Sequence, residues 1–260
     1  MTTPTGPVRI TSRANPVLVA LRRLARDGAA YRRSGMVWLE GEHLCQAALL
    51  RGWPVEQALL SERAWQRPQV RALVVAVERT AIVDDALFAD ITSLESPSDI
   101  GFVVRVPAPP RPRALLDSVV LDRVQDAGNA GSILRSAAAL GARQVLAIKG
   151  TVALWSPKVL RSGMGAHFAL QVVEGLGVDE VLSLGLPLVG TSSHDGVDLP
   201  QAQLPQPCAW LLGHEGQGVA PELLDACRCR VRIPQPGGEE SLNVAAAAAI
   251  CLYEGWRQRQ

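Results

Sequence analysis

Residues 118–150 read SVVLDRVQDAGNAGSILRSAAALGARQVLAIKG, and this stretch indicates the fold. Two short runs rich in valine and leucine, SVVLDRV and RQVLAIKG, have the length and composition of buried strands. Between them, GSILRSAAALGA has the composition and length of a helix. A strand, a helix and a second strand in this order predict a βαβ unit, in which the two strands are parallel.

The same alternation continues to the end of the chain. Further strands are expected in PLVGTSS, CAWLLG and CRVRIP, and further helices in PKVLRSG, VDEVLSLG, APELLDAC and SLNVAAAAAICLYEGWRQ. Residues 114–260 are therefore expected to form one α/β domain with a mostly parallel sheet. Ligands of such sheets lie beyond the carboxyl ends of the strands, so the loops that follow the strands are where chemistry is expected.

The part of the chain before this domain divides into three segments. A proline-rich linker, PAPPRPR, occupies residues 107–113, and such segments are semi-rigid spacers. Residues 35–106 alternate helical and strand patterns and predict a small α/β domain. Residues 1–34 form a basic arm: residues 1–36 hold seven arginines and one acid, a net charge of +6, which leaves −5 for the rest. This charge suits a polyanion such as RNA, although a solvated helix face explains it equally well.

Composition excludes several classes of protein. With 48% hydrophobic and 20% charged residues among 260, global disorder is not expected. The first residues lack the apolar run of a signal peptide, and the apolar run at 244–253 is too short to span a bilayer, so a cytoplasmic protein without membrane contact is expected. The five cysteines form no CxxC pair and no histidines stand at ligand spacing, so neither a disulfide framework nor a metal site is expected.

Two strand-end loops carry candidate functional residues. In the first, Asn129 stands at a helix entrance and Arg135 lies six residues further on. Free backbone N–H groups at a helix start bind anions, and a guanidinium grips a phosphate with two hydrogen bonds, but an ordinary helix cap and a surface arginine are an equally good interpretation. In the second, LLGHEGQGVAPELL surrounds Glu215 with three glycines, whose spacing does not match the dinucleotide-binding fingerprint.

A third loop, in RIPQPGGEESLNVAAAAAICLYE, places Ser241 and Asn243 where a long alanine-rich helix begins. A serine at such a position is very often only a helix cap. Taken alone, this loop does not indicate a site.

Together the three loops resemble the motifs of the SpoU family, also called TrmH-like, of the SPOUT class of RNA methyltransferases. The family's Asn-x-Gly-x-x-x-Arg, Gly-x-Glu-Gly-x-Gly and Ile-Pro…Ser-Leu-Asn-Val motifs correspond to residues 129–135, 213–218 and 233–244. SPKVLRSGMGAHF at 156–168 is also similar to the family, and the front half resembles its ribosomal-protein-like α/β substrate-binding domain. One departure is Gln235, where members commonly have methionine; it is expected to alter packing more than chemistry.

The resemblance implies a homodimeric enzyme that methylates a ribose 2′-hydroxyl of RNA with S-adenosylmethionine, which it binds in a trefoil knot built from about residue 187 onward. It implies catalytic roles for Arg135, Asn129, Glu215, Ser241 and Asn243. It implies cofactor contacts by Thr191, Gly213, His214, Glu215, Gly216, Ile233 and Leu242.

The roles expected within this site are specific. Because arginine stays protonated in proteins, Arg135 is expected to hold a phosphate and stabilise the developing alkoxide, with Glu215 fixing either Arg135 or Asn129. Asn129 and Arg135 are expected to meet the RNA across a dimer interface, where the alanine run 245–249 lets two helices approach closely or instead packs within one subunit.

Several alternatives stay open. Large-subunit ribosomal RNA is the preferred substrate, and transfer RNA is the alternative. A non-catalytic RNA-binding or ribosome-assembly factor of the same fold and a nucleotide-binding oxidoreductase are the other functions considered; the intact five-residue set and the glycine spacing, respectively, disfavour them. Trp53 and Trp65 are candidates for stacking on unpaired bases, whereas Trp38 lies in an apolar run and is expected in the core.

Overall fold

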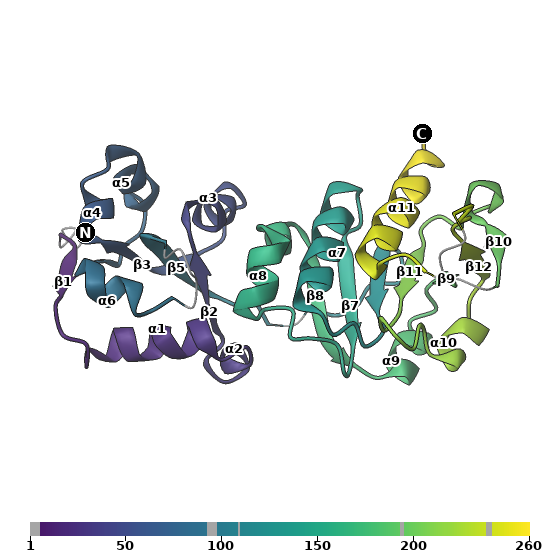
Figure 1. Ribbon diagram of the computed structural model, residues 1–260, viewed down its shortest axis with the longest axis horizontal. Coiled ribbons are helices and arrows are strands. Elements are labelled where there is room, and N and C mark those ends of the chain that lie inside the picture. Colours follow the sequence, from purple (N-terminus) through teal and green to yellow (C-terminus); the bar gives the residue numbers. More distant parts are fainter. Residues whose placement is uncertain (1–5, 93–97, 109, 193–194, 238–240) are drawn as a thin grey trace. The chain divides into compact units, whose positions relative to one another are not determined.

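The computed structural model describes residues 6–92, 98–108, 110–192, 195–237 and 241–260. The chain folds into two compact units (Figure 1). The first comprises Met1–Pro107 together with Trp155–Phe168, and the second comprises Ala108–Leu154 together with Ala169–Gln260.

The first unit is built on a five-stranded mixed sheet in the order β1-β4-β3-β5-β2. Strands β1, β4 and β3 are parallel, and β5 runs antiparallel to both β3 and β2. Its strands are β1 (Val8–Ile10), β2 (Met36–Glu40), β3 (Val55–Ser61), β4 (Thr80–Val83) and β5 (Ile100–Arg105). Its helices are α1 (Pro16–Arg26), α2 (Ala30–Ser34), α3 (Glu42–Leu50), α4 (Glu62–Trp65), α5 (Pro68–Val74), α6 (Asp85–Ala89) and α8 (Pro157–Gly163).

Helix α1 shows why this unit has a core of its own. Asn15 caps the helix by accepting a hydrogen bond from the Val17 N–H, and proline at the first helical position suits a helix start. Leu18 and Leu21 are buried against the sheet, in a cluster that also contains Trp38. Trp38 is therefore a core residue, as expected.

The described part of the first 34 residues is built into this unit. β1 is parallel to β4, and α1 contributes to the hydrophobic cluster. Several of the arginines are ion-paired: Asp90 alone lies within 3.5 Å of Arg13, Arg22 and Arg26. Three guanidinium groups around one carboxylate leave a local excess of positive charge.

The segment Trp155–Phe168 belongs to the first unit, although the residues before and after it in the sequence belong to the second. Aromatic packing is the reason, because the Trp53 ring lies 5.6 Å from Trp155 and 4.9 Å from Phe168 between centroids. Trp53 is half-buried in this cluster, and Trp65 is half-buried with Arg71 over its ring. A short 3₁₀ helix (Ala166–Ala169) ends the segment.

The second unit contains a seven-stranded sheet in the order β10-β12-β9-β11-β6-β7-β8, and every recorded pairing in it is parallel. Its strands are β6 (Ser118–Leu121), β7 (Gln144–Ile148), β8 (Gln171–Leu176), β9 (Leu188–Thr191), β10 (Val197–Asp198), β11 (Ala209–Leu212) and β12 (Cys229–Arg232). Its helices are α7 (Ala127–Ala139), α9 (Val178–Ser183), α10 (Pro221–Asp225) and α11 (Val244–Arg257), with a 3₁₀ turn at Leu199–Gln201.

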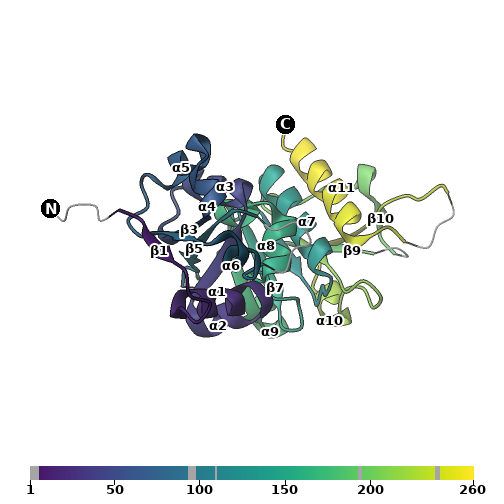
Figure 2. The ribbon, with the colours of Figure 1, turned by 60° about the vertical axis from the view of Figure 1, so that its left-hand side comes forward.

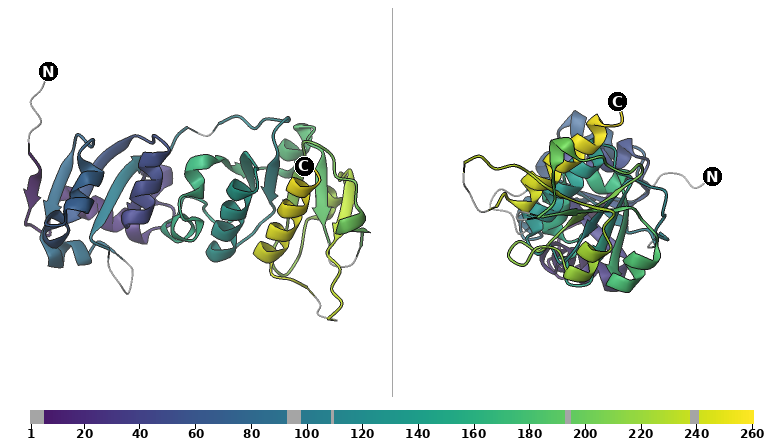
Figure 3. Two further views of the ribbon diagram at one scale, coloured as in Figure 1. Left: turned by 90° about the horizontal axis from the view of Figure 1, so that it is seen from above. Right: turned by 90° about the vertical axis from the view of Figure 1, so that its right-hand side faces the viewer.

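Helices cover both faces of this sheet. α9 and α10 contribute Val181 and Leu223 to a buried cluster with Val120 and Leu211 of the sheet. α7 and α11 pack side by side, as Figures 1 and 2 and the left view of Figure 3 show. Gly255 of α11 faces Trp210, where an added Cβ would lie 3.3 Å from the indole nitrogen, so glycine allows this close packing.

The expected α/β architecture with a mostly parallel sheet is confirmed, whereas the trefoil knot stays a prediction. The sequence patterns correctly placed β6, β7, β9, β11 and β12 and the five helices expected after residue 114. They missed β8 and the two-residue strand β10. No helix within the described ranges has the length and hydrophobicity that crossing a membrane requires.

The end of the proline-rich segment is fixed to the second unit's sheet. Buried Gln144 accepts a hydrogen bond from the Arg113 N–H (3.1 Å) and donates to the Arg113 carbonyl (2.8 Å) and to Ser118 Oγ (2.8 Å). Gln171 donates to the Arg111 carbonyl (2.6 Å). The described residues that end this segment are therefore held by hydrogen bonds.

Replacing Gln144 by leucine should lower the free energy of unfolding by about 1–3 kcal/mol, because it removes three hydrogen bonds of a buried side chain and leaves the partly buried backbone groups of Arg113 without these partners. Urea unfolding measures this loss, with Arg143→Ala as the control, since the Arg143 side chain is exposed and makes no recorded bond. A Gln144→Leu protein as stable as the wild type would contradict the anchoring role.

Candidate active site

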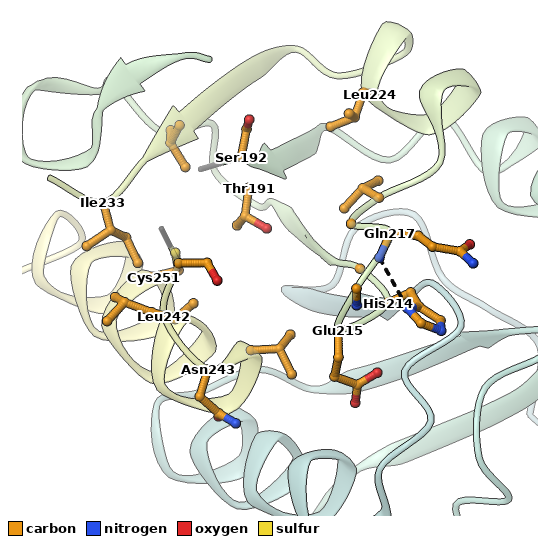
Figure 4. A pocket seen from close by; sticks show the side chains of 18 of the residues that line it. Thr191, Ser192, His214, Glu215, Gln217, Leu224, Ile233, Leu242, Asn243 and Cys251 are labelled. Atoms are coloured by element: carbon orange, nitrogen blue, oxygen red, sulfur yellow. Dashed lines mark hydrogen bonds between the residues drawn. The ribbon is translucent and has the colours of Figure 1, made fainter. Parts of the chain in front are cut away.

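A pocket of about 1010 Å³ lies at the carboxyl ends of β9, β11 and β12, beside the start of α11 (Figure 4). The strand-end loops expected to carry chemistry therefore line one cavity. All seven residues expected to contact a cofactor line it: Thr191, Gly213, His214, Glu215, Gly216, Ile233 and Leu242.

The loop at residues 213–218 is closed on itself. His214 and Gly218 exchange backbone hydrogen bonds of 3.0 and 2.8 Å, and His214 Nδ1 accepts the N–H groups of Gly216 (2.9 Å) and Gln217 (3.2 Å). A Cβ on Gly213 would lie 2.2 Å from the Gly218 carbonyl carbon, so only glycine fits there. Gly218 has a φ of 68°, a conformation that glycine adopts without strain.

The carboxylate of Glu215 connects this loop to the loop that precedes α7. Glu215 Oε1 accepts hydrogen bonds from the Asp126 N–H and from Asn129 Nδ2, both at 3.1 Å. Its Oε2 accepts the Gln125 N–H at 3.2 Å. Of the two partners expected for Glu215, the structure shows Asn129.

Asn129 carries the connection on to the third loop. Asn243 Nδ2 donates to Asn129 Oδ1 at 2.9 Å, while Asn243 Oδ1 caps α11 by accepting the N–H groups of Ala245 and Ala246. The helix cap is thus Asn243. Ser241 lies exposed on the pocket wall and makes no recorded hydrogen bond.

The same contacts keep Glu215 ionised. Partial burial raises the pKa of Glu215, but hydrogen bonds from the Asn129 side chain and from backbone N–H groups, including those of Asp126 and Gln125, outweigh it and lower the pKa below its ordinary value. A carboxylate whose two oxygens accept three hydrogen bonds positions its neighbours.

Arg135 stands apart from this network. Asn129 and Arg135 lie on the same helix, but six residues rotate the second side chain by about 120° away from the first and shift it by about 9 Å along the axis. Arg135 is exposed, is not among the residues that line the pocket, and has no recorded hydrogen bond or ion pair with the described residues.

Asp122 and Arg123, which the sequence did not indicate as functional, hold the glycine loop and the residues that follow it. Buried Asp122 accepts the Ala220 N–H at 2.7 Å and pairs with Arg123 at 2.8 and 3.1 Å. Arg123 also donates to Gln217 Oε1 at 2.9 Å. Arg123 has a φ of 59°, which is unfavourable for a side chain with a Cβ, so its two contacts compensate for local strain. Nothing in the local sequence predicts a positive φ at this arginine.

All five cysteines are free thiols, and burial raises the pKa of Cys227 to about 11 and that of Cys251 to about 12. Across the described residues, no three His, Cys, Asp or Glu side chains lie close enough to hold a metal ion.

Replacing Glu215 by glutamine should destabilise the protein at pH 7 by about 1 kcal/mol, a value reduced for the exposure of this group. The pKa of Glu215 in the folded protein lies below the unfolded value of about 4.3. The wild type should therefore exceed Glu215→Gln in free energy of unfolding by the full amount well above pH 4.3, and this difference should disappear as the pH falls through the folded-state pKa. Urea unfolding at pH 7 and pH 3.5 tests both points, with Glu78→Gln as a control on an exposed glutamate. A stability difference that persists unchanged at low pH would argue against an ionised Glu215 as its source.

Comparison with known proteins places this geometry in a family. The model of the SpoU rRNA methylase family matches residues 118–253. A 23S rRNA (uridine(2479)-2′-O)-methyltransferase of Streptomyces viridochromogenes is 32% identical over 96% of this chain and 92% of its own length. The 23S rRNA (guanosine(2553)-2′-O)-methyltransferase RlmP of Bacillus subtilis is 33% identical over 83% of this chain and 86% of its own.

A solved structure agrees with these relatives. The SpoU methyltransferase AviRb from Streptomyces viridochromogenes, in complex with AdoMet, superposes with a TM-score of 0.84 at 29% identity, covering 94% of this chain and 99% of AviRb. The family match spans more than half of the chain, from β6 to the last helix. The chain belongs to the SpoU rRNA methylase family.

Proposed function

We propose that this protein is an S-adenosylmethionine-dependent enzyme that methylates a ribose 2′-hydroxyl of large-subunit ribosomal RNA. One observation carries the proposal: Glu215 and Asn243, which Asn129 bridges, line a glycine-walled pocket in a chain of this family. An rRNA substrate also supports a cytoplasmic location.

The pocket fits S-adenosylmethionine in size and chemistry. Its volume is at the upper end of the range for small-molecule sites, about 300–1,000 Å³. Val219, Leu224 and Val231 offer an apolar wall to a purine, and the glycine loop exposes backbone groups to polar atoms. When bound, the cofactor supplies an electrophilic methyl group on a sulfonium.

The chain's own residues position the nucleophile. A ribose hydroxyl must lose its proton as its oxygen gains the methyl group, and alignment of the reacting atoms lowers the barrier by several kcal/mol. Both side-chain oxygens of Glu215 are occupied, so Glu215 orients Asn129, and Asn243 fixes the Asn129 amide from the other side. Ser241, exposed on the pocket wall, is free to contact substrate.

The guanidinium of Arg135 binds the phosphate beside the target ribose and stabilises the developing alkoxide. Since Arg135 turns away from Asn129, which contacts the pocket residues Glu215 and Asn243, it serves the pocket of a second copy of this chain. This completes each site with residues of two subunits.

The exposed face of α11 supports a homodimer. Ile250, Tyr253 and Trp256 stand three residues apart and are each about two-fifths to one-half exposed. The Tyr253 and Trp256 rings are in contact, with centroids 5.5 Å apart and planes inclined by 42°. Such a stripe of large apolar side chains is typical of a protein–protein contact. Ala248, within the alanine run, is instead buried inside its own subunit.

The first unit binds the RNA. The relatives named for 23S rRNA align with both units of this chain, and the arginines around Asp90 give the first unit excess positive charge. Trp53 and Trp65 are each half-buried and retain exposed ring surface for a base.

Purified protein supplied with methyl-labelled S-adenosylmethionine should label large-subunit rRNA, and nuclease mapping should place the label on one ribose. An RNA whose target ribose is replaced by deoxyribose should accept no label, because the nucleophile is missing. Label on a base of that deoxy substrate would refute the reaction, and label confined to tRNA would refute the substrate class.

Complementation tests the shared site. Arg135→Ala and Glu215→Ala should each lose most activity as homodimers. If each site combines Arg135 of one subunit with Glu215 of the other, a co-expressed mixture should recover about one quarter of wild-type activity, since half of the dimers are mixed and one of their two sites is intact. Activity in the mixture no higher than that of the single variants would show that both residues act within one subunit.

A further inference from the structure

Arg123, just beyond the carboxyl end of β6, connects this strand to the wall of the pocket. Its Nε and Nη2 donate to the carboxylate of buried Asp122 at 2.8 and 3.1 Å, and its Nη1 donates to Gln217 Oε1 at 2.9 Å. Gln217 belongs to the glycine loop, residues 213–218, and lines the pocket. One guanidinium therefore binds the end of the strand and the glycine loop at the same time.

The backbone of Arg123 is held in a conformation that a residue with a Cβ rarely adopts, with a φ of 59°. The following loop supports it, because the Arg123 N–H donates to Thr151 Oγ1 at 3.1 Å and Thr151 Oγ1 donates to the Leu121 carbonyl at 3.0 Å. Gly150 leaves room for the side chain, since a Cβ there would lie 3.1 Å from Arg123 Cγ. Strain of this kind persists only where the surroundings compensate for it, as these contacts do.

The side chain of Gln217 anchors the loop and does not reach across the cavity. In Figure 4 its amide points away from Ile233 and Leu242, which lie on the opposite wall. Its Oε1 accepts the hydrogen bond from Arg123, and its backbone N–H donates to His214 Nδ1 at 3.2 Å within the loop. Gln217 is therefore held from outside the loop by Arg123 and from inside it by His214.

Arg123 completes the attachment of the glycine loop to the rest of the domain. The carboxylate of Glu215 fixes the first half of the loop to the start of α7. Arg123 binds Gln217 in the second half, and Asp122 accepts the Ala220 N–H at 2.7 Å just after the loop. The two halves of the loop are thus held by separate side chains.

A ligand that contacts the backbone of this loop binds only when the loop is in place, and its apparent dissociation constant rises as the fraction of molecules in that state falls. We propose that Arg123 is a positioning residue for cofactor binding, which acts through Gln217 to hold the glycine loop in its binding-competent conformation. This inference rests on the proposed S-adenosylmethionine-dependent function. Arg123 is not among the residues that line the pocket, so it acts without touching the cofactor.

Replacing Gln217 by methionine tests the proposal, because methionine has a similar length and is at most a weak acceptor. Isothermal titration with S-adenosylhomocysteine should show a dissociation constant about threefold higher than for the wild type, since the loop loses one hydrogen bond from a charged group. The midpoint of urea unfolding should change little, because the lost bond is solvent-exposed. A merely structural role would instead lower stability and leave the affinity unchanged.

A conservative variant separates positioning from direct contact with the ligand. Gln217→Glu keeps an acceptor for Arg123 and should retain wild-type affinity for S-adenosylhomocysteine. If the Gln217 amide contacted the ligand itself, this variant would lose affinity as Gln217→Met does. Gln203→Met, a change at an exposed glutamine that makes no recorded hydrogen bond, should match the wild type in both measurements.

A double-mutant cycle shows whether Arg123 and Gln217 act as one unit. Arg123→Met should weaken binding at least threefold, and it should also lower the urea midpoint, because the buried Asp122 carboxylate loses its ionic partner. In the Arg123→Met protein, a further change of Gln217 to methionine or to glutamate should alter the dissociation constant by less than about twofold. If Arg123→Met does not fold, the comparison of Gln217→Met with Gln217→Glu still decides the question.

Three results would overturn the role of Arg123: wild-type affinity in Gln217→Met, equal losses in Gln217→Met and Gln217→Glu, or losses that add in full in the double variant. If the wild type does not bind S-adenosylhomocysteine, the proposed function fails and this inference fails with it. Binding by the wild type that no variant weakens removes only the role of Arg123.

Discussion

The carboxylate of Glu215 holds the site together, because its two oxygens accept hydrogen bonds from the loop that precedes α7 while its backbone belongs to the glycine loop after β11. Through Asn129 the same carboxylate is connected to Asn243 and hence to the start of α11. Asn129 lies 86 residues before Glu215 and 114 before Asn243 in the sequence, and the three segments that carry these residues are fixed relative to one another in this way. The arrangement depends on an ionised Glu215 and on a tight loop that orients its carboxylate. Gly213 and Gly218 allow the loop to be this tight.

Sequence reasoning could find these loops because each combines glycine with a polar side chain immediately after an apolar strand, as at Glu215, and because parallel strands bring their carboxyl ends to one edge. It could not find Arg123, since no sequence pattern predicts a positive φ at an arginine. β8 was missed because QVVEGL is short and carries a charge and a glycine. The membership of Trp155–Phe168 in the first unit follows from aromatic contacts between residues far apart in sequence.

The site divides its polar groups into two kinds. Asn129, Glu215 and Asn243 satisfy one another and so hold a fixed geometry before any ligand arrives, which reduces the reorganisation that a reaction requires. Arg135 has no such partner among the residues that the structure describes and lies exposed on α7. α7 packs beside α11, whose outer face carries Tyr253 and Trp256. In the proposed homodimer, Arg135 is the group that serves the neighbouring subunit and the phosphate of its substrate.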